Sequence, residues 1–304
     1  MEKKANQTAG QFAVLGTSVL MSTAGLTIKL LPWNPMVITG IRSIVAVVFL
    51  LIVRIVAPPS KNAKNPPVPL FAAAFFFTAM MFCFVIANKL TTSANAVMLQ
   101  YGAPIWAALL GWALIKEKPH WEHWGALVLI FTGLALFLRD GLGQGLLLGN
   151  VIAVFCGFFF GAHSVFLRML KDGNPADAML LSHAIGVFVG IPFIVLYPPT
   201  LTVPSVIAIL YMGIFQIGLA SLLFAYGLKR VKAAHAMIIA VAEPLLNPVW
   251  VFFVTGETPG KAALVGGVII ITAVVASTLI GKRREEQNVS GNSNGAPMTP
   301  LQND

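Results

Sequence analysis

The chain has 304 residues, of which 57% are hydrophobic and 10% are charged. A soluble globular protein is usually about 25% charged, so this chain has too little polar surface to face water on all sides. These values exclude an ordinary soluble protein and indicate a chain that has lipid as its main solvent. The net charge of +9 would also suit a nucleic-acid-binding protein, so the positions of the charges must decide.

The apolar residues occur in runs of about 20, the length that a helix needs to cross a hydrocarbon core of about 30 Å. Strands of a membrane barrel would alternate apolar and polar residues, and these runs do not. The fifth run has a polar start, because Glu122 and His123 lie there. We predict an all-α membrane protein with ten transmembrane helices, over residues 10–31, 35–56, 69–90, 92–115, 121–138, 146–170, 175–197, 203–228, 233–254 and 259–280.

Lysine and arginine are distributed unequally among the predicted loops and helix ends. With a cytoplasmic N-terminus, the inside holds fifteen of them, at Lys3, Lys4, Arg54, Lys61, Lys64, Lys116, Lys118, Arg168, Lys171, Lys229, Arg230, Lys232, Lys282, Arg283 and Arg284. The outside holds four, at Lys29, Lys89, Arg139 and Lys261. Cytoplasmic loops are enriched in these residues, so we predict that both termini are cytoplasmic. The basic excess is then a topology signal, and no nucleic-acid partner is expected.

Residues 1–9 and 282–304 are predicted cytoplasmic tails, and the second is polar enough to be disordered. The first apolar run is longer than that of a signal peptide and lacks a small-residue cleavage site, so we expect it to be retained. Cys83 and Cys156 both fall inside predicted spans, so neither a disulfide nor a metal site is expected. No organelle signal is found, which favours a bacterial inner membrane.

A shift of 140 residues, without any gap, superimposes the second half of the chain on the first. Prolines and a glutamate coincide, namely Asn34-Pro35 with Asn174-Pro175, Pro58-Pro59 with Pro198-Pro199, Pro104 with Pro244, Glu117 with Glu257 and Pro119 with Pro259. We therefore predict two homologous five-helix repeats, over residues 10–139 and 146–281. Five is an odd number, so the second repeat starts on the opposite side of the membrane and the two are inverted. Inverted repeats are typical of secondary transporters, whose substrate site lies near the midplane between the halves.

Each half carries a proline inside its fourth span and a glutamate at the end of that span. These stretches are Pro104 to Glu117 in the first half and Glu243 to Glu257 in the second. A further stretch, Thr39 to Ser43, carries an arginine in the second span. All three resemble stretches of the EamA-type members of the drug/metabolite transporter superfamily. The resemblance covers about residues 12–281 and implies ten helices around a central cavity. Bacterial members include exporters of amino acids, among them the YddG-like aromatic amino-acid exporters. Pro248 departs from the pattern, because the first half has Ala108 at that position.

Two charged residues lie well inside predicted spans, Arg42 and Glu243. At 1.5 Å per residue, Glu243 is about 15 Å deep, close to the midplane. The proline that follows it frees the carbonyl of Ala240 and weakens the helix where a substrate can bind. Residues at helical spacing form one stripe, of Ala240, Glu243, Pro244 and Asn247, and the 140-residue shift gives an opposing stripe, of Gln100, Ala103, Pro104 and Ala107. We predict that these two broken helices cross at the core of the site.

The guanidinium of Arg42 matches the geometry of a substrate carboxylate. The alternatives are an ion pair with Glu243 or a tie to backbone carbonyls at a helix end. The remaining candidate substrate-binding residues are Tyr101, His163, Ser164, Gln216 and Tyr226. For each of these taken singly, a hydrogen bond between helices is the alternative role. Glu243, His163 and His183 are the titratable candidates for proton coupling.

These features predict a secondary transporter that exports small metabolites, with amino acids first. Glu243 would face the amine of a zwitterion, and Arg42 or Gln100 its carboxylate. No P-loop is present, so direct use of ATP and a bound cofactor are not expected. A nucleotide-sugar or phosphorylated-metabolite carrier would need several buried basic residues, and Arg42 alone qualifies. A membrane-embedded enzyme of lipid intermediates would need a metal-ligand spacing, a nucleophile motif or paired carboxylates, and the chain lacks them.

Overall fold

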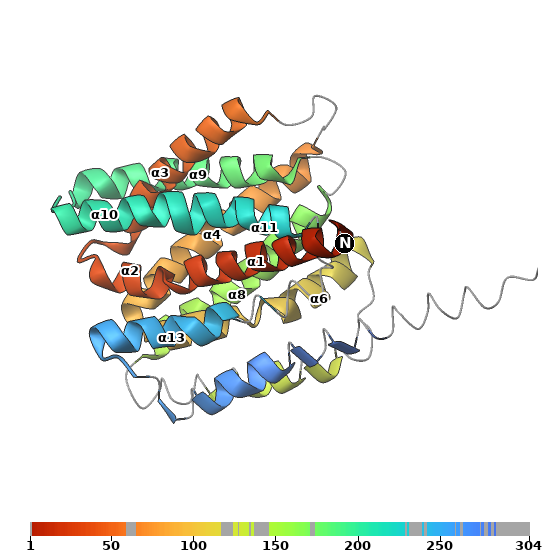
Figure 1. The fold of residues 1–304 in the computed structure, drawn as a ribbon. Helices are drawn as coiled ribbons and strands as arrows, with labels where there is room; N and C mark the ends of the chain where they lie inside the picture. The colour runs from red at the N-terminus through yellow and green to blue at the C-terminus, as the bar shows by residue number, and fades with distance from the viewer. Residues whose placement is uncertain are drawn as a thin grey trace, which may run out of the picture.

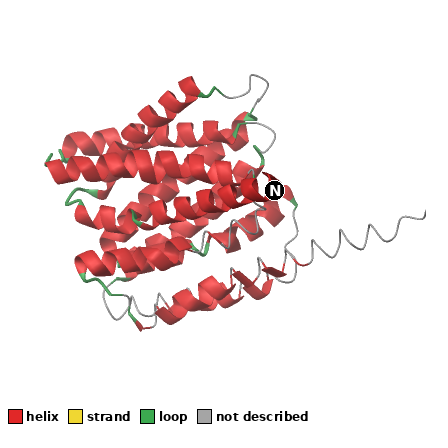
Figure 2. Cartoon of the chain, viewed as in Figure 1, coloured by secondary structure: helices red, strands yellow, loops and turns green. Residues whose placement is uncertain are grey.

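The structure is a computed structural model that describes residues 2–58, 65–116, 124–126, 128–133, 135–136, 146–170, 174–228, 230, 239, 242–258, 260–261, 264–273, 275–276, 279–280 and 283. Within these residues the regular structure is helical, without strands (Figure 2). The elements are α1 (Glu2–Ser22), α2 (Ala24–Leu30), α3 (Pro35–Val56), α4 (Pro67–Leu90), α5 (Ser93–Gln100), α6 (Ala103–Ile115), α8 (Leu147–Arg168), α9 (Pro175–Leu196), α10 (Val203–Tyr211), the π-helix η1 (Met212–Leu219), α11 (Ala220–Leu228) and α13 (Ala242–Thr255).

Seven stretches of the described chain are helical, long and apolar enough to cross a membrane, namely Thr8–Leu30, Pro35–Val56, Pro67–Leu90, Ser93–Ile115, Leu147–Arg168, Ala176–Leu196 and Val203–Leu223. They coincide with seven of the predicted spans, so the prediction of an all-helical, multi-pass chain is confirmed. Two shorter apolar helices, Trp124–Gly133 and Leu264–Ala273, fall within the fifth and tenth predicted spans, and α13 falls mostly within the ninth. The count of ten and the inverted arrangement remain predictions.

Several predictions fall on residues that the structure does not describe. They concern Glu117, Pro119, Ala240, Pro259 and most of the C-terminal tail.

Several helices begin at residues that suit a helix N-terminus, either a proline or a capping side chain. Pro35 opens α3 and Pro175 opens α9, positions at which the missing N–H of proline costs no hydrogen bond. The side chain of Asn34 accepts a hydrogen bond from Met36 N at 2.9 Å and so caps α3. At α10, Thr202 and Ser205 form a reciprocal capping box.

The helices lie side by side in one bundle (Figure 1). We call the end at which the N-terminus lies the proximal end, and the opposite end, where α2 finishes, the distal end. The helix α3 packs on α9 and α4 packs on α8. A Cβ atom on Gly190 would lie 2.4 Å from Gly40 Cα, so only glycine permits this approach of α9 to α3.

The 140-residue shift relates each of several pairs of packed helices to another pair of packed helices. Shifting α8 back by 140 residues places it on α1 and α2, and shifting α4 forward places it on the end of α10, η1 and α11. Accordingly α4 packs on α8 and α1 packs on α11. The pair α6–α8 likewise matches α13–α1, and α4–α9 matches η1–α3. Helices that the shift relates to one another thus pack in corresponding pairs.

Within the described residues, three of the spans depart from a continuous α-helix inside the bundle. The first breaks at Thr23, between α1 and α2, and the fourth breaks at Tyr101 and Gly102, between α5 and α6. The hydroxyl of Thr23 donates to Leu20 O at 2.7 Å, a bond back along the helix that bends it. In the fourth span, Pro104 has no N–H to bond the carbonyl four residues back. The eighth span contains η1, and π-helical segments frequently occur at functional sites.

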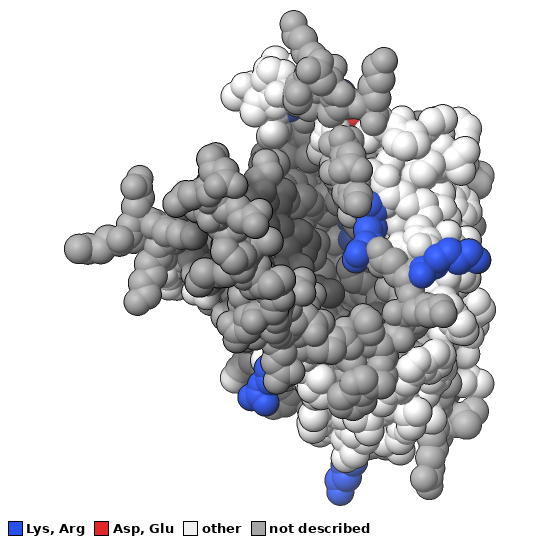
Figure 3. Space-filling view, turned by 90° about the vertical axis from the view of Figure 1, so that its right-hand side faces the viewer, with Lys and Arg blue, Asp and Glu red and all other residues white. Residues whose placement is uncertain are grey.

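The proximal end is the more basic one. Arg54 and Arg168 lie in the last turns of α3 and α8, and Lys116 caps the end of α6. Viewed from this side, lysine and arginine side chains lie around the face (Figure 3).

Candidate substrate site at the interrupted spans

A carboxylate and a phenol from opposite halves of the chain meet at the break of the fourth span. Glu243 lies in the first turn of α13, and Tyr101 lies directly after α5. The Tyr101 hydroxyl donates to Glu243 Oε2 at 3.2 Å. A carboxylate in the first turn also interacts favourably with the helix dipole. The contact therefore lies where the two predicted stripes were expected to meet, since Tyr101 directly follows Gln100 in the chain.

One turn further along α13, Asn247 holds the helix against the break of the first span. Its side chain is fully buried, and its Nδ2 donates to Ser22 O at 2.8 Å. Trp250 Nε1 donates to the Ser22 hydroxyl at 2.9 Å. Beside them, a Cβ atom on Gly25 would lie 2.8 Å from the Asn247 amide, so glycine makes room for this contact. The last residue of α1 is thus bonded twice to α13.

The π-helix reaches the same break from the other side. Gln216, which is 3% exposed, donates from Nε2 to Thr23 Oγ1 at 2.8 Å and to Thr27 Oγ1 at 3.1 Å. The Thr23 hydroxyl also lies 3.1 Å from the Tyr211 hydroxyl. The break of the first span is therefore lined by hydroxyl and amide groups from η1, α10 and α13.

The break of the fourth span is backed by α8. A Cβ atom on Gly161 would lie 2.7 Å from Ala103 O, and one on Gly157 would lie 3.2 Å from Gln100 O. The two glycines therefore let α8 pack directly on exposed backbone. Gln100 itself turns to α4, with its Nε2 at 3.7 Å from Met80 Sδ.

Together these contacts gather one carboxylate, a phenol and several neutral hydrogen-bonding groups at interrupted helices. A carboxylate with a phenol suits a protonated amine, and amides with hydroxyls suit polar groups of either kind. No group of three or more His, Cys, Asp or Glu side chains among the described residues is arranged to hold a metal ion.

Three other predicted site residues make their contacts elsewhere. His163 Nδ1 lies 2.8 Å from Ala73 O, with its ring against Phe77. The Ser164 hydroxyl is exposed and donates to Phe160 O of its own helix. The ring of Tyr226 is covered by the Arg230 guanidinium at 3.5 Å. Their roles in substrate binding stay predictions.

Arg42 is buried in α3, with 5% of its surface exposed. Its Nη2 donates to Met81 O at 3.3 Å, and its Nε has no partner among the described residues. The ion pairs within the described chain are Lys29–Glu257 and Arg54–Asp177, so Arg42 is not paired with Glu243 there. The bond of Arg42 to Met81 O is a tie to a backbone carbonyl, but Met81 lies inside α4 and not at a helix end. The role of Arg42 in substrate binding stays a prediction.

Several residues at the breaks were not predicted from the sequence, namely Ser22, Thr23, Thr27, Tyr211 and Trp250. A usable signal existed for the first three. Ser22 and Thr23 are adjacent hydroxyls inside an apolar run, and Thr27 follows at the spacing of one helical turn.

A multi-pass helical bundle whose interrupted spans converge on buried polar groups defines the class of a membrane transporter. Comparison with known proteins agrees. The profile of the EamA-like transporter family matches residues 8–139 and, a second time, residues 147–279. The chain therefore belongs to the EamA-like transporter family.

Similar proteins are also described as transporters. An uncharacterized transporter of Archaeoglobus fulgidus is 24% identical over 267 residues, which are 88% of this chain and 95% of that protein. The uncharacterized transporter YwfM of Bacillus subtilis is 28% identical over 224 residues, 70% of this chain and 76% of YwfM. A solved crystal structure shares the fold with a TM-score of 0.64 and 17% identity, over 92% of this chain and 99% of the other. The protein is a membrane transporter and not an enzyme.

Proposed function

We propose that this protein is a secondary active transporter that exports small metabolites, with amino acids as the first class of substrate. The observation that carries the proposal is the contact of Tyr101 with Glu243, because it joins the two halves of the chain at an interrupted helix. A site between two halves is accessible to either side in turn when one half rocks against the other.

The chemistry of the site suits a zwitterion. The Glu243 carboxylate can replace its bond to Tyr101 by an ion pair with a substrate amine, and the freed phenol can then bind a second polar atom. Gln100 is the candidate donor to the substrate carboxylate, because Arg42 is tied to Met81 O. Tyr101, Tyr211 and Trp250 add aromatic surface at or near the breaks, which supports an aromatic amino acid of the kind that YddG-like exporters carry.

The inverted repeat belongs to the proposal and has two supports. The family profile matches twice, at positions offset by 139 residues (8 to 147). The helix pairs that pack together are also exchanged by the 140-residue shift, as α4–α8 and α1–α11 are. We place the basic proximal end in the cytoplasm, with both termini there, because cytoplasmic loops and helix ends are enriched in lysine and arginine.

The test is reconstitution of the purified protein into proteoliposomes, followed by counterflow of a panel of radiolabelled amino acids and of sugar phosphates. We expect saturable counterflow of at least one amino acid, abolished in Glu243→Gln. A proton-coupled export would in addition respond to an imposed pH gradient. Transport of a sugar phosphate alone, with no amino acid carried, would overturn the substrate class.

A further inference from the structure

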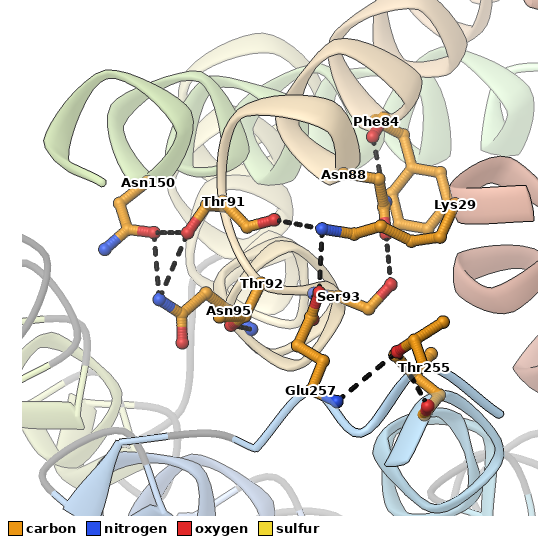
Figure 4. A network of polar contacts seen from close by, with 11 residues as sticks. Lys29, Phe84, Asn88, Thr91, Thr92, Ser93, Asn95, Asn150, Thr255 and Glu257 are labelled. Carbon is orange, nitrogen blue, oxygen red and sulfur yellow. Dashed lines mark hydrogen bonds and ion pairs between the residues drawn. The ribbon is translucent and has the colours of Figure 1, made fainter. Parts of the chain in front are cut away.

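A lysine and a glutamate connect the two halves of the chain at the distal end. Lys29 lies in the last turn of α2, and its Nζ donates to Glu257 Oε2 at 2.8 Å and to Thr91 O at 2.9 Å (Figure 4). Lys29 and Thr91 belong to the first half, and Glu257 belongs to the second. We call this arrangement the distal clasp.

The second oxygen of Glu257 closes the start of another helix. Ser93 is the first residue of α5, and its backbone N–H donates to Glu257 Oε1 at 2.5 Å. A carboxylate at a helix N-terminus is stabilised by the free N–H groups and by the helix dipole. The clasp therefore fastens α13 to α2 and to α5 through one side chain.

The backbone before Glu257 is shaped for this position. The helix α13 ends at Thr255, and Gly256 adopts a φ of +70°, a conformation that glycine takes without the strain of a Cβ atom. Glu257 N then faces the Thr255 hydroxyl at 3.4 Å. The turn directs the carboxylate back toward α5, as Figure 4 shows.

A network of neutral hydrogen bonds lies beside the clasp (Figure 4). The Ser93 hydroxyl donates to Asn88 Oδ1 at 2.6 Å, and the Thr91 hydroxyl donates to Asn150 Oδ1 at 2.6 Å. Asn95 Nδ2 donates to the same Asn150 oxygen at 3.1 Å. Asn150 belongs to the second half, so Thr91 and Asn95 also join the halves here through neutral hydrogen bonds, and Lys29–Glu257 is the ion pair that joins them at this end of the described chain.

The clasp lies on the same spans that carry the candidate substrate site. Lys29 is six residues beyond the break at Thr23, about 9 Å along the helix at 1.5 Å per residue. Ser93 precedes the break at Tyr101 on α5, and Glu257 follows the helix that carries Glu243 and Asn247. A pocket of about 190 Å³ lies over the clasp, lined by Lys29, Lys89, Thr91 and Glu257 among others. The ion pair is thus reached by water, each side chain being 21% exposed.

We propose that the Lys29–Glu257 ion pair is the gate that closes the distal end of the transport pathway, and that it opens when the distal side becomes accessible. This inference rests on the alternating access of the proposed function. The structure then represents a state with the distal gate closed, because the ion pair is formed.

Distances between spin labels test the gate without any substrate. Leu30 and Val254, which are exposed at the ends of α2 and α13, are replaced by cysteine in a chain whose Cys83 and Cys156 are alanine. Pulsed electron paramagnetic resonance of the doubly labelled protein in detergent then reports the separation of the two helices. Glu257→Gln keeps the bond to Ser93 N but loses the charge. In this variant the ratio of short to long distances should fall about tenfold, which corresponds to a loss of about 1.4 kcal/mol from the free energy that favours the closed gate. Lys29→Met should behave alike.

Two variants serve as matched controls. Lys89→Met removes the other lysine of the pocket, whose Nζ bonds Leu31 O within the same half. Asp177→Asn removes the ion pair with Arg54, which joins α3 to α9. Both should keep the parent distance distribution. If Glu257→Gln and Lys29→Met are monodisperse and also keep it, or if Lys89→Met widens it equally, the gate is overturned. Absence of amino-acid counterflow in the parent would instead overturn the proposed function and leave the distance result standing.

Discussion

Tyr101 and Glu243 are 142 residues apart in the chain, and a hydrogen bond of 3.2 Å joins their side chains where one helix is interrupted and another begins. The bond is made between the two halves that match the family profile separately. A substrate that takes the carboxylate from the phenol therefore changes the contact between the halves. Binding and conformational change are coupled wherever a ligand interacts differently with the two states.

Replacing Glu243 by glutamine should abolish counterflow of the amino-acid substrate, because the amide cannot carry a negative charge or a proton. The variant should fold, since the oxygen of the introduced amide can still accept a hydrogen bond from Tyr101. Tyr101→Phe is the graded companion, expected to lower the apparent affinity about tenfold through loss of the hydrogen bond that the freed phenol makes to a second polar atom of the substrate. Elution volume in size-exclusion chromatography checks the fold of both. Unchanged counterflow by Glu243→Gln would remove the carboxylate from the site.

Replacing Thr23 by valine should impair both stability and transport. The hydroxyl accepts from Gln216 and lies beside the Tyr211 hydroxyl, so its loss removes one of the two hydrogen bonds of the buried Gln216 amide and the contact with Tyr211. We expect a cost of about 1–2 kcal/mol in the free energy of unfolding, seen as a lower melting temperature in detergent. Thr132→Val is the matched control, because the exposed Thr132 hydroxyl donates, within the described chain, to Val128 O of its own helix. Equal melting temperatures for the two variants would contradict the expectation.

The spans could be read from the sequence because hydropathy is a property of local composition. The predicted span 35–56 has the bounds of α3, and 146–170 differs from α8 by one residue at its start and two at its end. The interruptions in the first and eighth spans could not be read in this way. Mean hydropathy does not show that a run bends at Thr23 or winds as a π-helix at Gln216, although the adjacent hydroxyls of Ser22 and Thr23 mark the first of these places.

The candidate site could be predicted where proline marks it. Pro104 and Pro244 drew attention to the fourth and ninth spans, and Tyr101 and Glu243 meet beside them. The partners of Asn247 and Gln216 could not be foreseen, because Ser22 and Thr23 are 225 and 193 residues away and only packing brings them together. Glu257 was recognised from the repeat, but its partner Lys29 has no counterpart at the same offset, where Met169 stands.

Arg42→Lys should leave the apparent affinity for the substrate unchanged and lower thermal stability. The Arg42 side chain is buried and bonds Met81 O, a tie that a lysine would make less well because it lacks the guanidinium fork. Counterflow at graded substrate concentrations, together with the melting temperature, separates the two effects. A large rise in the concentration for half-maximal counterflow at unchanged stability would instead assign Arg42 to the substrate carboxylate.

Gly161→Ala should destabilise the protein, whereas Gly111→Ala should not. The added methyl group at position 161 would lie 2.7 Å from Ala103 O and 2.8 Å from Ala107 N, both backbone atoms that cannot move aside cheaply. Overpacking of this kind costs about 1–3 kcal/mol. At position 111, in α6, nothing lies within 4 Å of the added atom. Melting temperatures in the same detergent compare the two, and a similar loss in both would contradict the close packing of α8 on the break of the fourth span.

The inverted repeat and the distal gate together make a prediction about Glu117, which lies outside the described residues. The 140-residue shift relates Glu117 to Glu257 and Ala233 to Ser93. If the two halves are inverted copies, Glu117 should stabilise closure of the proximal end as Glu257 stabilises closure of the distal end. Glu117→Gln should then favour the distal-closed state and narrow the Leu30–Val254 distance distribution, the opposite of Glu257→Gln. Glu122→Gln, a change of the same kind five residues further on, should leave the distribution as in the parent. A broadening in Glu117→Gln would contradict the exchange of roles between the halves, even with the distal gate established.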